Sequence, residues 1–236
     1  MQHEITQAIP LLDEQGELTQ PGWARRLLPV YDRSRVRGGP LRLKERDCYL
    51  VMNRQCALAL TISDNRYMGM DSISLIDLWE GWQVTRSPMR LMPLGGTGLP
   101  QSSLRGSCAR AGRGYGLLFQ HEGEGRTLHA HMDRFRDGQA LDAQILLTQE
   151  PEESIVMCTP FEKPGQFYFN QKINCMRAQG KVTLGDREYV FDPEDSFAVL
   201  DWGRGVWTCR GTWYWGSASG MVDGVPFGFN IGYGFG

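Results

Sequence analysis

The sequence contains few of the signals that identify common classes of enzyme, transporter or secreted protein. It has no stretch of about 18 consecutive apolar residues, so we expect no membrane-spanning helix. The N-terminal segment MQHEITQAIPLLDEQGELTQ has neither a basic start nor an apolar centre, and we therefore expect no secretion signal. Together these features predict a cytoplasmic protein.

The charges of the chain are nearly balanced. The 25 Lys and Arg residues stand against 27 Asp and Glu residues, which gives a formal net charge of -2. A nucleic-acid-binding domain normally carries a basic excess, so we expect no nucleic-acid partner. One local basic cluster, interrupted by acidic residues, is interpreted as a solvated edge of the fold. It comprises Arg33, Arg35, Arg37, Arg42, Lys44 and Arg46.

The six Cys residues are scattered and form no C-x-x-C pair. Structural zinc sites usually use such pairs, so we expect reduced and mostly buried thiols instead. His129 and His131 lie two residues apart on an expected strand and share one face, so they could supply two metal ligands. Because no complete ligand set is visible around them, we expect no metal.

Motifs for nucleotides and for acyl transfer are incomplete as well. The segment 95–98 lacks the Lys that completes a phosphate-binding loop, and no G-x-G-x-x-G segment opens a helix. The segment 216–220 resembles a nucleophile elbow but has Ala218 at its centre, where that motif needs Ser. The sequence therefore predicts no cofactor and disfavours a Ser-His-Asp hydrolase.

Glycine and aromatic residues are abundant instead. The chain has 29 Gly among 236 residues and 11% aromatic residues, and frequent Gly disfavours helices. From Asp47 onward, short apolar runs are separated by turn signals such as Asp137-Gly138 and Gly185-Asp186. This pattern predicts an all-β protein, an antiparallel barrel or curved sandwich, with few helices. A brief helix is expected only around residues 193–196.

The last two expected strands, joined at Asp223-Gly224, divide their residues sharply between two faces. In the first strand, one face carries Trp213, Trp215, Ser217 and Ser219, and the other carries Tyr214, Gly216, Ala218 and Gly220. In the second strand, Gly or Asn residues alternate with Phe227, Phe229, Ile231, Tyr233 and Phe235. One face is therefore large and apolar, and the other is almost bare backbone that can bend a sheet. We expect a curved sheet whose aromatic side chains line an interior, either an ordinary core or a ligand cavity.

The segment FAVLDWGRG contains the clearest candidate for chemistry. Asp201 follows an apolar run that would desolvate it, raise its pKa and suit a proton donor. Arg204, three residues further on, could instead pair with Asp201 and keep it ionised. A structural ion pair that closes the sheet is a third interpretation. Asn170, Lys172 and Asn174 share one strand face, which lines either a site or the solvent-exposed surface.

Several longer segments resemble an uncharacterised bacterial family, domain-of-unknown-function family 2804. They are FNQKINCM, FDPEDSFAVLDWGRGVW, TWYWGSASG and PFGFNIGYGFG, with PLLDEQGELTQPGWARR and YMGMDSISLIDLW nearer the N-terminus. The resemblance implies a lipocalin-like (calycin-like) β fold and a distant relation to carotenoid 1,2-hydratase, fungal pericyclases and survival-factor proteins. The hydratase-like relatives have a His before the Trp-Gly pair. No His precedes Trp202-Gly203 here, which argues against a His-assisted mechanism.

On this basis we expect three parts in the chain. Residues 1–46 form an irregular arm packed on the body, with Trp23 as an anchor, and residues 47–200 form a first lipocalin-like β domain. Residues 201–236 are Gly- and Trp-rich strands. Because family members run on past this point and the alternating pattern reaches Gly236, we expect this part to open a second β unit in a truncated chain.

Two functions follow as hypotheses. The first is binding of a hydrophobic or amphipathic small molecule, such as a lipid or isoprenoid, in an aromatic-lined β cavity. The second is a cofactor-free hydratase or isomerase/cyclase, with Asp201 as the acid, Arg204 orienting it and Trp rings stabilising positive charge. The expected ligand-binding residues are Trp202, Trp207, Trp213, Trp215, Asn170, Lys172, Asn174 and Phe229. A carbohydrate-active site that uses Glu194 and Asp195 with Asp201 ranks below both.

Overall fold

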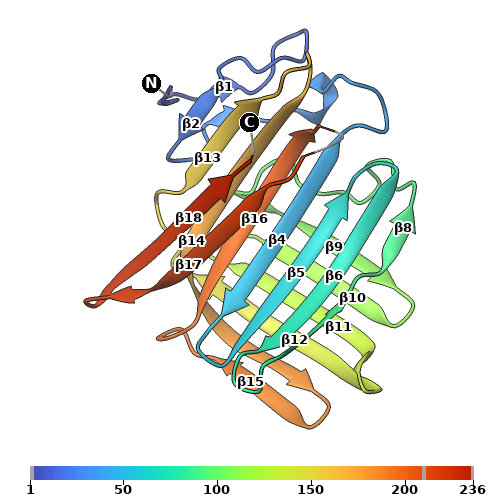
Figure 1. The fold of residues 1–236 in the computed structure, drawn as a ribbon, viewed down its shortest axis with the longest axis vertical. Helices are drawn as coiled ribbons and strands as arrows, with labels where there is room; N and C mark the ends of the chain where they lie inside the picture. Colours follow the sequence, from blue (N-terminus) through green and yellow to red (C-terminus); the bar gives the residue numbers. More distant parts are fainter. Residues whose placement is uncertain (1–2, 209–210, 235–236) are drawn as a thin grey trace.

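The computed structural model describes residues 3–208 and 211–234. In these residues the regular secondary structure consists of β-strands and one turn of 3-10 helix at Arg33–Arg35 (Figure 1). The strands are β1 (Ile9–Pro10), β2 (Gly22–Ala24), β3 (Pro29–Val30), β4 (Lys44–Met52), β5 (Cys56–Asp64), β6 (Met68–Asp77), β7 (Trp82–Arg86), β8 (Met89–Leu91), β9 (Gly106–Gly112), β10 (Tyr115–His121), β11 (Arg126–Arg136), β12 (Gln139–Thr148), β13 (Ile155–Pro160), β14 (Phe167–Leu184), β15 (Arg187–Phe191), β16 (Phe197–Val206), β17 (Tyr214–Val222) and β18 (Val225–Tyr233).

Most of these strands belong to one large antiparallel sheet. Its main path runs β7-β6-β5-β4-β16-β14-β12-β11-β10-β9, and β2, β8, β13 and β15 pair beside this path. In the described part of the chain the two ends of the path, β7 and β9, do not pair with each other, so the sheet stays open. The predicted all-β antiparallel fold is confirmed as a curved sandwich, whereas the closed-barrel alternative is wrong.

The sheet folds over on itself to give two layers. In Figure 1, β10, β11 and β12 cross behind β4, β5 and β6 at a steep angle. Strand β14 joins the layers, because its first half pairs with β13 and β16 and its second half with β12 and β15. Its register shifts between Ile173 and Met176, where Cys175 has a φ of 61°. A bulge of this kind bends a strand, which lets β14 serve both layers.

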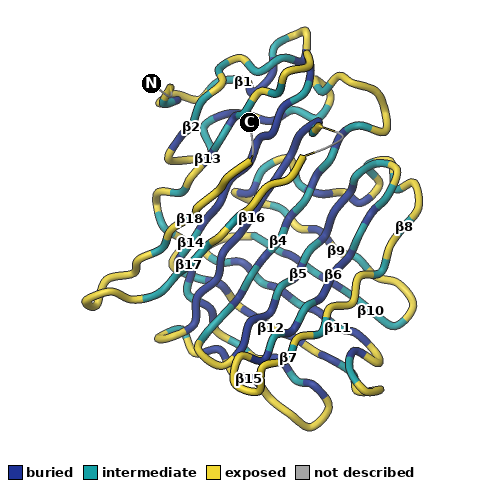
Figure 2. Tube along the Cα trace, viewed as in Figure 1, coloured by how far each residue is buried: buried dark blue, intermediate teal, exposed yellow. Residues whose placement is uncertain are grey.

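The core lies between the two layers. Strands β4, β11 and β12 alternate buried with less buried residues, as expected for strands with one face toward the core. The largest fully buried side chains include Phe135, Phe167, Phe169, Phe191 and Trp202. Strand β16 differs, because every one of its residues is buried (Figure 2). One face of β16 meets the core, and the hairpin β17–β18 contacts the other.

The hairpin β17–β18 turns at Asp223-Gly224, as predicted, and lies on β14 and β16. The side of β18 that faces β14 is the one with small side chains. A Cβ added to Gly228 would lie 2.7 Å from Cys175 Sγ and 2.9 Å from Asn174 Cβ. Only glycine allows this close approach of the two backbones.

The large apolar residues of β18 therefore point away from the body. Phe227, Phe229, Ile231 and Tyr233 are between 43% and 77% exposed. The prediction that they line an interior is wrong, because the bare backbone is the surface that packs against the sheet. Phe235 and Gly236 lie outside the described residues.

The N-terminal arm packs on the body, with Trp23 of β2 paired with Met157 of β13. The boundaries expected at residues 46 and 201 fall inside β4 and β16, so residues 201–206 belong to the large sheet. The short helix expected at residues 193–196 is wrong, because a turn between β15 and β16 occupies this position.

The Cys residues that the structure describes are all free thiols, and all but the half-buried Cys48 are buried, as expected. Cys209 lies outside the described residues. In those residues no helix has the length and apolar character needed to cross a membrane.

Gly180 provides a test of the two-layer arrangement. It pairs with Ile145 of β12 and Phe191 of β15, has a φ of 144°, and an added Cβ would lie 2.0 Å from the Gln144 main-chain oxygen. Gly180→Ala should lower the free energy of unfolding by about 1–3 kcal/mol in urea denaturation. Gly216→Ala, whose added Cβ meets no atom within 4 Å, should change it by less than about 0.5 kcal/mol. Equal stability of the two variants would contradict this register.

Candidate functional site

A cluster of buried charges lies on the outer face of the sheet, where β4, β16 and β14 run side by side. The register places Asp201 of β16 opposite Lys172 of β14 and opposite Cys48 of β4. Residues directly opposite one another in neighbouring strands share a face, so Asp201 and Lys172 point the same way. Both are buried, with 2% and 7% of their surface exposed.

The Asp201 carboxylate is held between two cations. Lys172 Nζ donates to Oδ1 at 2.6 Å, and the guanidinium of Arg46 donates to Oδ2. Arg46 lies two residues before Cys48 on β4, so the strand places it on the same face. Two cationic donors stabilise the ionised carboxylate. This geometry matches the interpretation of Asp201 as a member of a structural ion pair, with Lys172 and Arg46 as its partners.

The two cations respond differently to burial. Burial lowers the pKa of Lys172, and attraction to Asp201 offsets only part of that change. Burial also acts against the charge on Arg46, but Asp201, Tyr168 and Cys48 together outweigh it, so the pKa of Arg46 is raised. Of the two cations, Lys172 is therefore the one that releases its proton more readily.

Two of the predicted Trp residues cover this cluster from the hairpin. The ring centroid of Trp215 is 4.3 Å from Lys172 Nζ, and that of Trp213 is 5.9 Å from Arg46 Cζ. Aromatic faces attract cations, and here they also keep water away from the ion pairs. The indole nitrogen of Trp215 donates to Asn230 Oδ1 at 3.0 Å, which fixes the ring.

Asn174 attaches the hairpin to the sheet. Its amide nitrogen donates to Ser217 Oγ at 2.8 Å and to the Ala218 main-chain oxygen at 3.0 Å, and its own oxygen accepts from Asn230. Asn170, on the same face of β14, is completely buried. Asn174 therefore attaches this polar strip to the hairpin, and Asn170 is shielded from solvent.

Trp202 and Arg204 lie on the opposite face of β16, inside the sandwich. Successive side chains of a strand point to opposite faces, so neither residue reaches Asp201. The prediction that Arg204 pairs with Asp201 or orients it is therefore wrong. Arg204 contacts Asp47 at 2.8 Å, and its guanidinium lies 4.2 Å from the Trp202 ring centroid. Burial raises the pKa of Asp47, and Arg204 opposes that change.

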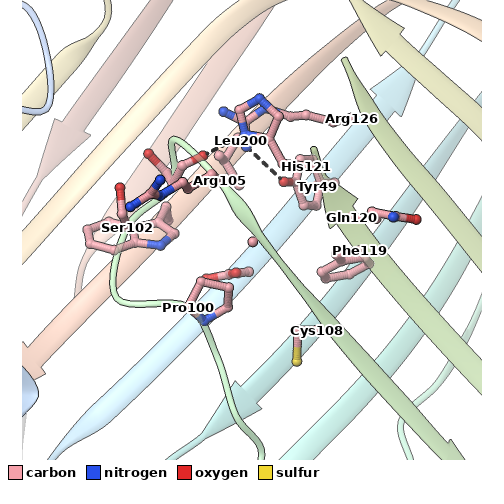
Figure 3. A pocket seen from close by; sticks show the side chains of 14 residues that line it. Tyr49, Pro100, Ser102, Arg105, Cys108, Phe119, Gln120, His121, Arg126 and Leu200 are labelled. Carbon is pink, nitrogen blue, oxygen red and sulfur yellow. Dashed lines mark hydrogen bonds between the residues drawn. The ribbon is translucent and has the colours of Figure 1, made fainter. Parts of the chain in front are cut away.

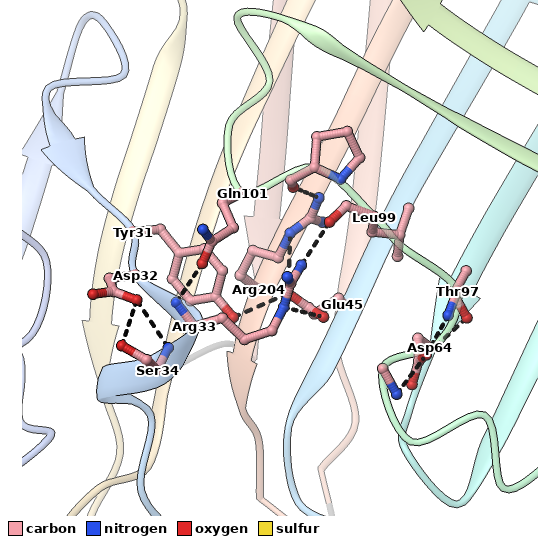
Figure 4. A network of polar contacts seen from close by, with 12 residues as sticks. Tyr31, Asp32, Arg33, Ser34, Glu45, Asp64, Thr97, Leu99, Gln101 and Arg204 are labelled. Carbon is pink, nitrogen blue, oxygen red and sulfur yellow. Dashed lines mark hydrogen bonds and ion pairs between the residues drawn. The ribbon is translucent and has the colours of Figure 1, made fainter.

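Arg204 belongs to a network that attaches the N-terminal arm to the sheet (Figure 4). Glu45 of β4 accepts hydrogen bonds from the Tyr31 hydroxyl and from Arg33 Nε, both at 3.0 Å, and Arg204 Nε lies 3.7 Å from it. Arg33 also donates to the Leu99 main-chain oxygen at 2.5 Å. Two members of the basic cluster, Arg33 here and Arg46 on the outer face, are thus ion-pair residues and not part of a solvated edge.

The space between the two layers is nearly filled. A cavity there, seen in Figure 3, has a volume of about 20 Å³, with room for about one water molecule. Tyr49, Phe119, Arg126 and Trp202 are among its walls. This interior has no room for a lipid-sized molecule, and Trp202, packed edge-on against Phe169 at 5.3 Å, is a core residue.

A larger groove opens on the outer face of β14, between β13 and β18. Its volume is about 630 Å³. Apolar residues from both sides line it, including Trp23, Ile155, Pro226 and Phe229. Polar residues of β14 form its floor, among them Lys172, Asn174 and Arg177. Lys172 therefore belongs both to the groove and to the buried charge cluster.

The structure brings most of the predicted site residues to one face but not to one cavity. Lys172, Asn174 and Phe229 line the groove, whereas Asp201, Trp213 and Trp215 lie in or over the charge cluster beside it. Trp207 packs edge-on against Tyr168 at 5.4 Å, away from the residues that line the groove. The sequence prediction missed Arg46, Trp23 as a groove residue, and Arg177. Of these, only Arg46 could have been found from the sequence. It lies two residues before Cys48, so a strand that began at Arg46 would place both side chains on one face.

His129 and His131 lie on the outer face of the second layer. His131 Nδ1 is 2.8 Å from Asp142 Oδ1, and its Nε2 is 2.9 Å from Asp133 Oδ1. These hydrogen bonds, that to Asp142 first, raise the pKa of His131. Among the residues that the structure describes, no group of His, Cys, Asp or Glu is arranged to hold a metal ion.

Comparison with known proteins identifies one family and one related structure. The family model described as a domain of unknown function, DUF2804, matches residues 2–236. No curated protein matches the chain. A Nitrosomonas europaea protein provisionally named AttH has a similar solved structure, with 11% sequence identity and a TM-score of 0.46. The match covers 79% of this chain and 59% of that protein, so the chain spans less than two thirds of its length.

The charge cluster predicts a large effect of neutralising Asp201. Asp201→Asn leaves the buried Lys172 and the partly buried Arg46 without a compensating charge, and it should lower the free energy of unfolding by about 3 kcal/mol in urea denaturation. Asp186→Asn, in the exposed turn between β14 and β15, should change it by less than about 0.5 kcal/mol. If the two variants were equally stable, the cluster would not be buried as described.

His131 predicts a pH-dependent contribution to stability. Because its pKa is raised above the value of 6.5 by two carboxylates, the folded state binds this proton more tightly than the unfolded state does. The stabilisation is present in full below pH 6.5 and is lost as the pH rises through the raised pKa. His131→Gln should therefore destabilise the protein at about pH 5.5 and have little effect at about pH 9. Denaturation at both values, with His129→Gln as the matched control, checks this; a loss independent of pH would refute it.

Proposed function

The chain belongs to the DUF2804 family, and from that premise we propose that it binds an amphipathic small molecule, such as an isoprenoid or lipid with a polar end, in the groove over β14. The observation that carries the proposal is the groove itself, about 630 Å³ of space with apolar sides and a cationic floor. Clefts of this size and mixed lining are typical of small-molecule sites.

The sides of the groove suit an apolar chain. Trp23 and Ile155 form one side, and Pro226 and Phe229 form the other. Ile155 is 37% exposed, so an apolar ligand chain lying against it would remove apolar surface of both partners from water. Each buried methylene group contributes roughly 0.8 kcal/mol, which is enough for a short isoprenoid to bind.

The floor of the groove suits the polar end of such a ligand. Arg177 donates to the main-chain oxygens of Pro193 at 2.9 Å and Glu194 at 3.1 Å. Among the described residues it has no carboxylate partner, so its positive charge is not neutralised locally. The charge on Lys172 is shared with Asp201. An anionic group such as a carboxylate is therefore best placed at the Arg177 end, with the chain running toward Trp23.

Calorimetric titration with geranic acid, a short isoprenoid that ends in a carboxylate, tests this function. We expect saturable binding that Trp23→Ala weakens about tenfold, equivalent to about 1.4 kcal/mol, because one apolar side of the groove is lost. Trp79→Ala is the matched control, since Trp79 is 82% exposed and does not line the groove.

A second variant distinguishes the contribution of the ligand's polar end from that of its apolar chain. Arg177→Met should weaken binding of geranic acid and leave binding of geraniol, the corresponding alcohol, nearly unchanged, because only the acid carries a charge. The proposal would be refuted by the absence of saturable binding of both compounds, or by equal affinities of the Trp23→Ala and Trp79→Ala variants.

A further inference from the structure

We propose that Lys172 captures ligands that carry an aldehyde or ketone group, by forming an imine through its Nζ. This inference rests on the proposed function, because it names the chemical class of ligand that the same groove would hold. Its geometric basis is that Lys172 lines the groove while its ammonium group lies inside the charge cluster. A carbonyl compound lying in the groove therefore lies beside Lys172, the one lysine among the residues that line it.

The groups around Lys172 favour a reactive amine. Asp201 of β16 accepts its proton at 2.6 Å, and the ring of Trp215 covers Nζ at 4.3 Å. Arg46 of β4 shares the same carboxylate, so one negative charge serves two cations. Cys48, the other titratable neighbour on β4, is held as a neutral thiol because burial raises its pKa. Burial lowers the pKa of Lys172, the nearby charge of Arg46 adds to this, and attraction to Asp201 offsets only part of it. The neutral amine that a lowered pKa favours is the nucleophile in imine formation.

The scarcity of lysine makes this position distinctive. The chain has 4 Lys among its 25 basic residues, the other 21 being Arg, which stays protonated. Lys163 and Lys181 are exposed and Lys44 is half-buried, so Lys172 is the one buried amine among the four. The other three lysines are therefore internal controls for selective reaction.

The reaction can be balanced with groups that the structure supplies. Asp201 takes one proton from the Lys172 ammonium group, and the nitrogen lone pair attacks the carbonyl carbon to form a C–N bond. The carbonyl oxygen takes up the second nitrogen proton and becomes a hydroxyl group. Asp201 then returns its proton to this hydroxyl, which leaves as water. The product is a protonated imine, whose positive charge stays between the Asp201 carboxylate and the Trp215 ring.

Reductive trapping followed by peptide mapping tests the inference. The protein is incubated near neutral pH with geranial, the aldehyde of the same isoprenoid series, together with cyanoborohydride. Each modified lysine gains the mass of the aldehyde less one oxygen atom. We expect the Lys172 peptide to be labelled faster than those of Lys163 and Lys181, because a lowered pKa raises the fraction of neutral amine at neutral pH.

Two further arms keep the result decisive. Lys172→Arg should abolish the fast labelling and Lys181→Arg should not, while mapping of the unsubstituted protein decides the question even if Lys172→Arg fails to fold. Labelling that instead follows exposure, with Lys163 and Lys181 modified first, would overturn the inference. If geraniol binds saturably in that case, the proposed function stands and only the imine fails; if geraniol does not bind either, the groove itself is refuted as a binding site.

Discussion

Burial of three charged groups beneath one hairpin is the constraint on which the outer face of the sheet depends. Removing an ion from water costs several kcal/mol unless it is well paired, so Arg46 and Lys172 require Asp201 between them. The cluster also needs the aromatic cover provided by Trp215 of β17 and by Trp213, which directly precedes that strand. Strand β16, which lies between β4 and β14 in the sheet, is therefore buried on both faces.

Side chains of β16 alternate between its two faces, and this separates two groups of ion pairs whose residues are close in sequence. Asp201 points outward and anchors the groove floor, whereas Arg204 points inward and, through Glu45, attaches the N-terminal arm. The arm in turn places β2 beside β13, which forms one side of the groove. Both faces of β16 are thus held by ion pairs. Through Asp201, β16 fixes the position of Lys172 on the neighbouring strand β14.

The strands were predictable because their apolar period is strong, and so was the hairpin turn at Asp223-Gly224. The alternation in β18 shows which residues share a face but not which face packs, and the close approach at Gly228 decides that. The sequence pattern indicates two separate strands where β14 is one, because the bulge at Cys175 interrupts the alternation of its residues. The partnership of Arg46 with Asp201 spans 155 residues, and no local pattern reveals a pairing at that distance.

Hydrogen–deuterium exchange in the presence and absence of geranic acid tests the central claim most directly, because it locates bound ligand on the backbone without any substitution. The account predicts slower exchange confined to residues 23–25, 149–155, 172–177 and 226–230, the segments that surround the groove. Protection that fell instead on the strands around the interior cavity, or no protection at saturating ligand, would contradict the assignment of the groove over β14 as the binding site.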